Sequence, residues 1–230
     1  MDCGRARADE GESARLTACE SDARSLRREH RGHHEQSKVE GGVMEHVEWC
    51  PDAYLQSGLS GQRIAVAGHS HWSNDPDHDA FTDECLRNVI SGKWRIAFFT
   101  SIARSFGFED RTDFWSRVLF FNFLPTKVGN GDERNGYGRP DQLEVGRARV
   151  LRILDQHKPD KLFVFSTKAW GEFPHTIEDQ AGVEAQPPLY WHTYQTRSGH
   201  RVKAVGLRHP QGADGTAMRE RVQALMANPI

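Results

Sequence analysis

Five short runs of apolar residues alternate along the chain with segments of helical periodicity, which is the pattern of strands separated by helices. The runs are 63–68, 118–124, 161–166, 189–196 and 201–207, of which the fourth is the most polar. The first run, RIAVAG, is apolar between its opening arginine and its closing glycine, as strands buried in a parallel sheet are. We therefore expect an α/β fold with three layers, α/β/α, built on a mainly parallel central sheet.

Helices are expected at 79–91, 94–108, 139–160 and 167–173, and from about residue 214. In the second segment Phe98, Ile102 and Phe106 recur at every fourth position, which places them on one face. The segment 139–160 carries the clearest signals, because Asp141 with Glu144 predicts a capped start and Pro159 predicts the end. Its expected apolar stripe consists of Leu143, Val150, Leu151 and Leu154.

Residues 1–43 differ in composition from the rest of the chain. They are dense in both charge signs and contain no Phe, Trp or Tyr, so they cannot bury enough apolar area to offset the entropy of ordering. We expect a disordered extension or a weak charged helix, with the alternative that Met44 is the natural start. Function is expected in a single domain, 44–230.

The composition of the chain limits the kinds of partner and cofactor that it can bind. The formal net charge is -2, with 30 Lys and Arg against 32 Asp and Glu, so a local basic patch has to hold any anionic partner. The scattered cysteines argue against a disulfide framework, a structural zinc or an iron–sulfur cluster; they are Cys3, Cys19, Cys50 and Cys85. No apolar stretch approaches the ~18 residues of a membrane span. We expect a cytoplasmic monomer with no cofactor or metal.

Unusual residues follow three of the expected strands, and ligands of open α/β sheets bind beyond the carboxyl ends of strands. The first such segment, GHSHWSNDPDHD, holds three histidines and three aspartates that could bind a divalent metal. It also resembles the G-x-S-x-G turn of serine hydrolases, but Trp72 stands where the last glycine is needed. The third alternative is a polar loop with incidental histidines. The metal candidates are His69, His71, His78, Asp75, Asp77 and Asp79.

Asn122 lies within the second segment, FFNFLPTKVGNGDERNGYGRP, flanked by phenylalanines. A buried strand asparagine must satisfy its donors and acceptors, either with a neighbouring loop or with the amide edge of a ligand such as a nucleobase. Lys127, Arg134 and Arg139 in the same segment are candidates for phosphate contacts, unless the segment is an ordinary loop. In the third segment, RHPQG, a strand ends at His209 because Pro210 cannot continue a ladder.

In this order the motifs AGHSHW, FFNFLP and GLRHPQG resemble those of the uracil-DNA glycosylase superfamily, over residues 60–225. The Arg-Pro before the helix and the Lys-Pro-Asp after it resemble the middle segment of that family. The resemblance implies a DNA partner with one nucleotide flipped out of the duplex, and a monofunctional enzyme that hydrolyses the N-glycosidic bond.

The resemblance also implies roles for individual residues. His209 would stabilise negative charge on the departing base, and Asn122 would read the base. His69 or Asp77 would activate water, since Ser70 stands where the best-known members have aspartate. Trp72 or Phe81 would stack on the base. Asn74 and Asp75 would line the base pocket, and the DNA-backbone contacts would be Ser70, Lys127, Arg139, Arg208 and Gln211.

The departure from the family pattern at Ser70 places uracil itself in doubt as the substrate. The polar turn of His69, His71, Asn74 and Asp75 suits a sugar-bearing base, such as the glucosylated hydroxymethylcytosine of phage DNA, excised in bacterial defence. The alternatives are uracil excision in base-excision repair, a catalytically silent DNA-binding member, and a metal-dependent hydrolase built on the His/Asp turn.

Overall fold

The computed structural model describes residues 44–129, 136–174 and 192–227, all within one compact unit, Val43–Ile230. The expectations for residues 1–43, for Arg134 and for the start of the run 189–196 lie outside the described residues. Among the cysteines in the described ranges, Cys50 and Cys85 are both free thiols.

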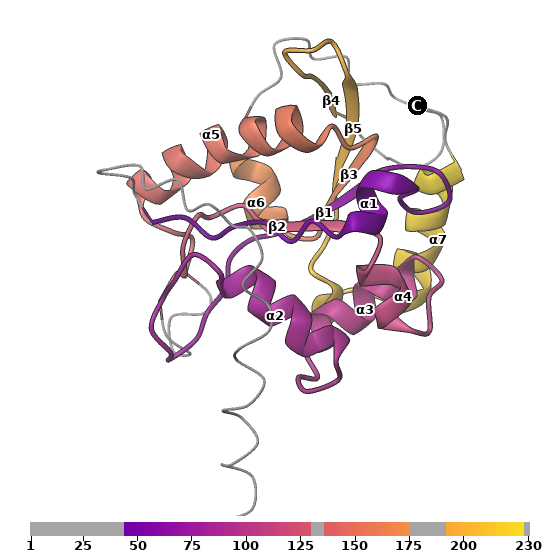
Figure 1. Cartoon of the computed structure of the whole chain (residues 1–230), viewed down its shortest axis with the longest axis horizontal. Helices are drawn as coiled ribbons and strands as arrows, with labels where there is room; N and C mark the ends of the chain where they lie inside the picture. The colour runs from indigo at the N-terminus through magenta and orange to yellow at the C-terminus, as the bar shows by residue number, and fades with distance from the viewer. Residues whose placement is uncertain (1–43, 130–135, 175–191, 228–230) are drawn as a thin grey trace, which may run out of the picture. The chain divides into compact units, whose positions relative to one another are not determined.

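Five strands form one sheet in the order β2-β1-β3-β5-β4 (Figure 1). They are β1 (Ile64–Gly68), β2 (Leu119–Asn122), β3 (Lys161–Val164), β4 (His192–Gln195) and β5 (Arg201–Gly206). The first four strands of that order are parallel, and β4 pairs antiparallel with β5 at the edge. The α/β class and the mainly parallel sheet expected from the sequence are confirmed.

Helices pack on both faces of this sheet (Figure 1). One face is covered by α2 (Phe81–Ile90), α3 (Ala97–Ser105), α4 (Arg111–Trp115) and α7 (Gly215–Ala227). The other face is covered by α1 (Asp52–Gln56), α5 (Pro140–His157) and α6 (Thr167–Glu172). The five-residue helices α1 and α4 were not expected, because a single turn or so is too short to show a period.

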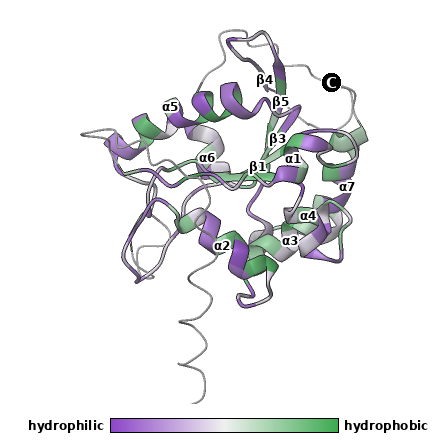
Figure 2. Ribbon diagram, in the orientation of Figure 1, coloured by the Kyte–Doolittle hydropathy of each residue, from purple (hydrophilic) through white to green (hydrophobic). Residues whose placement is uncertain are grey.

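Strand residues alternate between the two cores, as the two-residue period of a strand requires. Val66 and Phe120 face α3 and α4, whereas Ala67 and Phe121 face α5. Figure 2 shows hydrophobic residues concentrated on the central strands, while α5 is largely hydrophilic. The sheet is therefore buried on both sides, and polar groups can reach a ligand only beyond its ends.

The start and the buried face of α5 differ from the expectation. The helix begins at Pro140, and the backbone N–H of Arg139 donates to Oε1 of Gln142 at 2.9 Å, so the predicted Asp141–Glu144 capping pair is wrong. The placement of Leu151 in the apolar stripe is also wrong, since its side chain is 48% exposed. The buried face could not be recognised from apolar periodicity, because several of its residues are polar. It consists of Gln142, Gly146, Arg149, Val150, Ile153, Leu154 and His157.

Arg149 is the largest of these polar residues and is fully buried. Its guanidinium donates to the carbonyl oxygen of His46 at 2.6 Å, to the Glu45 carboxylate at 2.9 Å and to the carbonyl oxygen of Asn122 at 3.3 Å. Because a buried charge needs this many partners, Arg149 ties the segment before α1 to the carboxyl end of β2. No helix in the described part of the chain is long and apolar enough to cross a membrane.

Candidate functional site

The carboxyl ends of β1 and β2 lie side by side, because Gly68 pairs with Asn122 at the last position of both strands. The segments that follow are also joined, with Phe123 N–H donating to the Gly68 carbonyl at 3.0 Å and Leu124 N–H to the His69 carbonyl at 2.9 Å. This edge of the sheet therefore holds two of the three segments expected to carry the chemistry.

Asn122 is buried, with 3% of its surface exposed, and its side-chain oxygen lies 2.3 Å from the position of a β-carbon on Gly68, too close for one to be present. Within the described residues no hydrogen bond holds the carboxamide, whereas the backbone carbonyl of Asn122 accepts from Arg149. Its nitrogen and oxygen are not among the fully buried side-chain atoms that lack a partner, so the end of the side chain reaches the surface. An amide group that reaches the surface can bond to a ligand that offers a matching donor and acceptor. The carboxamide thus remains available for a ligand with an amide edge, while Gly68 leaves it the space.

Phe98 connects this pair to the end of β5. The tip of its ring lies 3.5 Å from the same β-carbon position on Gly68, and the ring packs on the His209 imidazole with centroids 5.1 Å apart. Phe98 is only partly buried, and it projects from the first turn of α3. One aromatic ring therefore spans the distance from β1 and β2 to His209, two strands away in the sheet.

His209 stands before the short 3-10 turn Pro210–Gly212, and its Nδ1 accepts from the backbone N–H of Gln211 at 3.3 Å. An imidazole that accepts through Nδ1 carries its proton on Nε2 when it is neutral. His209 is exposed, but desolvation by its neighbours, with the Phe98 ring against it, lowers the pKa of the imidazole and favours that neutral form at pH 7. The side chain consequently offers one fixed donor, Nε2–H.

His69 belongs to a second cluster on the α6 side of the sheet edge. Burial lowers its pKa, the charge of Lys168 adds to this effect, and a hydrogen bond with the backbone of Tyr137 opposes it. Its Nε2 is buried without a partner in the described structure. Lys168 also lies 4.2 Å above the Tyr137 ring. With Nδ1 bonded to Tyr137, the free Nε2 carries the lone pair and can accept a proton.

His71, Asp77 and Phe81 form a third cluster around His46. Burial lowers the pKa of His71 to about 3, and its Nε2 lies 3.0 Å from the Thr82 hydroxyl. Asp77 contacts His46 Nε2 at 2.6 Å and accepts from the Lys127 backbone N–H at 3.1 Å. Phe81 stacks on His46 and is 8% exposed. These side chains hold the first turn against the segment before α1.

The remaining residues of the first turn are mostly at the surface. Trp72 is 51% exposed, and Asn74 and Asp75 are exposed, the latter held by the Ser73 hydroxyl at 2.8 Å. Ser70 donates to the carbonyl oxygen of His71 at 2.7 Å, which closes the turn. Trp72, Asn74 and Asp75 are therefore exposed, whereas Asn122 is buried.

The expected phosphate contacts are spread along the same edge. Arg208 and Gln211 are exposed on either side of His209, and Arg139 is exposed and paired with Asp141 at 2.9 Å. The ammonium group of Lys127 donates to the carbonyl oxygen of Ser73 at 3.3 Å and to that of Asp75.

The His/Asp turn is not drawn together as a metal site. His71, Asp77 and His78 are directed to Thr82, His46 and Glu84 respectively. No three His, Cys, Asp or Glu side chains converge on one point in the part of the chain described.

Comparison with known proteins adds no relative to this picture, since no family model matches the chain and no curated protein matches it significantly.

Two site residues escaped the sequence analysis. Phe98 was expected only on the apolar face of its helix, and nothing in that pattern distinguishes a ring that touches a ligand from one that fills the core. Lys168 follows β3, the strand end at which no unusual residue was noted. The sequence does contain one indication of this position: Ser166 is typical of a helix cap, which places Lys168 in the first turn of a helix after β3.

Proposed function

We propose that this chain is a monofunctional DNA glycosylase, which excises a base flipped out of DNA and leaves an abasic site. The observation that carries the proposal is the carboxamide of Asn122, which no hydrogen bond holds within the described residues, beside Phe98, whose ring packs on a neutral His209. An edge reader, a stacking surface and a hydrogen-bond donor are the parts that such a pocket needs. The resemblance of three motifs to the uracil-DNA glycosylase superfamily, now found on parallel strands of one sheet, supports it.

In the proposed reaction the bond between C1′ of the sugar and the base nitrogen breaks, and its electrons remain on the base. His209 Nε2–H donates a hydrogen bond to a base oxygen as this charge develops. Water then bonds to C1′, one of its protons is released, and the base is protonated. His69, with a free Nε2, is the group we assign to orient water. Asp77 receives no role, because both carboxylate oxygens already have partners.

Asn122 is suited to pyrimidines because its carboxamide both donates and accepts. It can match the N3–H and O4 edge of uracil or, rotated, the N3 and amino edge of a cytosine. For a glucosylated hydroxymethylcytosine the residues left to bind the glucose are Asn74 and Asp75, since His71 is directed to Thr82 and His69 is assigned to water. We propose the glucosylated base, and a role in defence against phage, as the more specific form of the function.

The test is excision from a panel of oligonucleotides that contain uracil, hypoxanthine, hydroxymethylcytosine or glucosylated hydroxymethylcytosine, scored by strand cleavage after alkali. We expect cleavage of one substrate, loss of it in His209→Ala, and no effect of a chelator. Cleavage of uracil alone would exclude the sugar-bearing substrate. Binding to DNA without any cleavage would support the catalytically silent alternative and exclude the proposed enzyme.

A further inference from the structure

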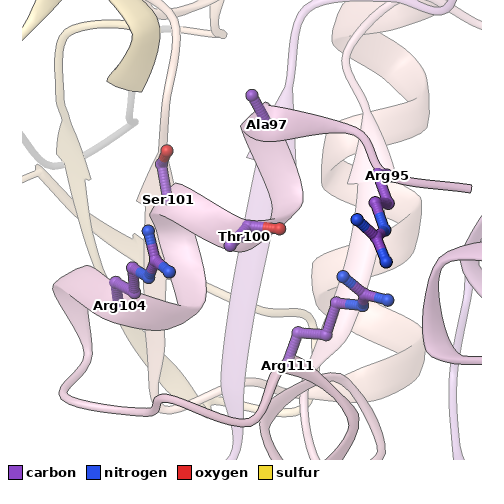
Figure 3. Close-up of a pocket in the computed structure, with 6 residues that line it drawn as sticks. All are labelled: Arg95, Ala97, Thr100, Ser101, Arg104 and Arg111. Atoms are coloured by element: carbon purple, nitrogen blue, oxygen red, sulfur yellow. The ribbon is translucent and has the colours of Figure 1, made fainter. Parts of the chain in front are cut away.

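A hollow of about 410 Å³ opens on the outer side of α3 and is lined by Arg95, Ala97, Thr100, Ser101, Arg104 and Arg111 (Figure 3). Three guanidinium groups and two hydroxyl groups are hydrogen-bond donors, and no carboxylate lines the hollow. The nearest acidic partner recorded is Glu109, at 3.9 Å from Arg104 Nε and at 79% exposure. The chemistry of the lining therefore favours an anion.

The arginines are arranged with like charges facing one another. Figure 3 shows the guanidinium groups of Arg95 and Arg111 directed toward each other, with the Thr100 hydroxyl pointing to the same gap. Arg111 is fixed, because its Nε donates to the carbonyl oxygen of Val89 at 2.8 Å. Within the described ranges, neither Arg95 nor Arg111 has a carboxylate within 4.0 Å. An anion in the gap would relieve the repulsion and accept from both groups.

The hollow lies next to the candidate site. Ala97 lines it, while the adjacent residue, Phe98, packs on His209. Helix α3 also contacts the turn Pro210–Gly212 that follows His209. The first turn of α3 therefore contributes to both the hollow and the candidate site.

We propose that Arg95, Arg104 and Arg111 form a phosphate-binding pocket for the backbone of the DNA strand that carries the flipped nucleotide. This inference rests on the proposed function for the identity of the polyanion. Guanidinium groups bind phosphate through paired hydrogen bonds, and the hydroxyl of Thr100 adds a donor without a charge. The near-zero net charge of the chain makes such a local patch necessary for binding DNA.

The test compares the full-length chain with its Arg95→Gln/Arg104→Gln variant, which leaves the structurally bonded Arg111 in place. The matched control is Arg117→Gln/Arg197→Gln, which removes the same charge near the amino ends of β2 and β5, at the opposite edge of the sheet. Affinity for a fluorescent single-stranded oligonucleotide is measured by anisotropy between 50 and 200 mM NaCl, values chosen because phosphate contacts are strongly salt-dependent there (about 10³–10⁵ in affinity for 6–10 contacts). Circular dichroism confirms that each variant folds.

We expect the pocket variant to bind at least about tenfold more weakly at low salt, with a slope of log affinity against log salt smaller by about one to two, and the control to change little. Equal affinity and slope in the two variants would overturn the inference. The inference would also be overturned if the pocket variant bound pyrophosphate more weakly but bound DNA as tightly as the parent. The pocket would then hold a free phosphorylated ligand. If DNA binding depends on the pocket but no base is excised, the inference stands and the proposed enzyme fails.

Discussion

The side-chain oxygen of Asn122 occupies the place that a β-carbon on residue 68 would need, so glycine at position 68 and the position of the carboxamide depend on each other. Gly68 is in an ordinary strand conformation, which means that space rather than backbone freedom requires glycine there. The Asn122 backbone is held at the same time by the buried guanidinium of Arg149. Gly68 and Arg149 thus fix the position of Asn122, and its carboxamide can still bind a ligand.

Gly68→Ala should displace the Asn122 carboxamide and reduce base excision by about tenfold or more, since misplacing a positioning group by an ångström costs up to about a hundredfold. The measurement is single-turnover excision of the substrate found in the oligonucleotide panel. Gly171→Ala is the control, because a β-carbon at that position of α6 meets nothing within 4 Å. Equal rates in the two variants would show that Asn122 does not act in the reaction.

His209→Ala should slow excision by about a hundredfold to a thousandfold, the usual cost of removing one preorganised donor at a developing charge. Binding of the product analogue with an abasic site should change much less, because His209 acts mainly when the bond breaks. His78→Ala provides a histidine removal elsewhere at this edge, and it should leave the rate unchanged. A His209→Ala variant as fast as the parent would contradict the assigned role.

Phe98→Ala should weaken binding of DNA that carries the target base by about 1–3 kcal/mol, the range found when a stacking ring is removed. Phe98→Tyr keeps the ring and should retain most of the affinity. Anisotropy titrations with and without the target base separate stacking from backbone contacts. A loss that is the same for both DNAs would mean that Phe98 only supports the fold.

The pair formed by Glu48 and His157 should make stability depend on pH. Burial opposes both charges. The hydrogen bond of His157 with Cys50, followed by its contact with Glu48 at 2.7 Å, raises the pKa of His157 to about 9, and the contact with His157 lowers the pKa of Glu48 to about 2. The His157 contribution is complete below its ordinary pKa of 6.5 and disappears as pH rises through 9. The Glu48 contribution is complete above its ordinary pKa of 4.5 and disappears toward pH 2.

Glu48→Gln should therefore lower the free energy of unfolding most between pH 4.5 and 6.5, by about 1.5–3 kcal/mol, and least above pH 9. Urea titrations at pH 6 and at pH 10 measure the difference. Glu84→Gln, which alters an exposed contact of 3.8 Å with His78, should change stability by less than about 0.5 kcal/mol. A loss for Glu48→Gln that is equal at both pH values would contradict the ion pair.

Much of the sheet could be predicted because most of its strands are short apolar runs, two of which, β1 and β5, end at glycine. The helices were harder where tertiary contacts replace apolar periodicity, as on α5, whose buried face includes Arg149 and Gln142. For the site, Asn122 and His209 could be named from strand ends alone. Their connection through Phe98 could not, because it depends on how α3 packs across the sheet, which no local pattern encodes.

Strand β5 is inserted between β3 and β4, and it is the last strand in the chain to be synthesised. Residues 68 and 122 can already be adjacent before residues 201–206 exist, but His209 reaches Phe98 only after β5 has joined β3. Parallel pairings between segments so distant in sequence are slow to form, because loop closure precedes the contacts that reward it. Folding from the ribosome should therefore leave the pocket incomplete until residues 201–209 have emerged, so that His209 is the last of these three groups to reach its place.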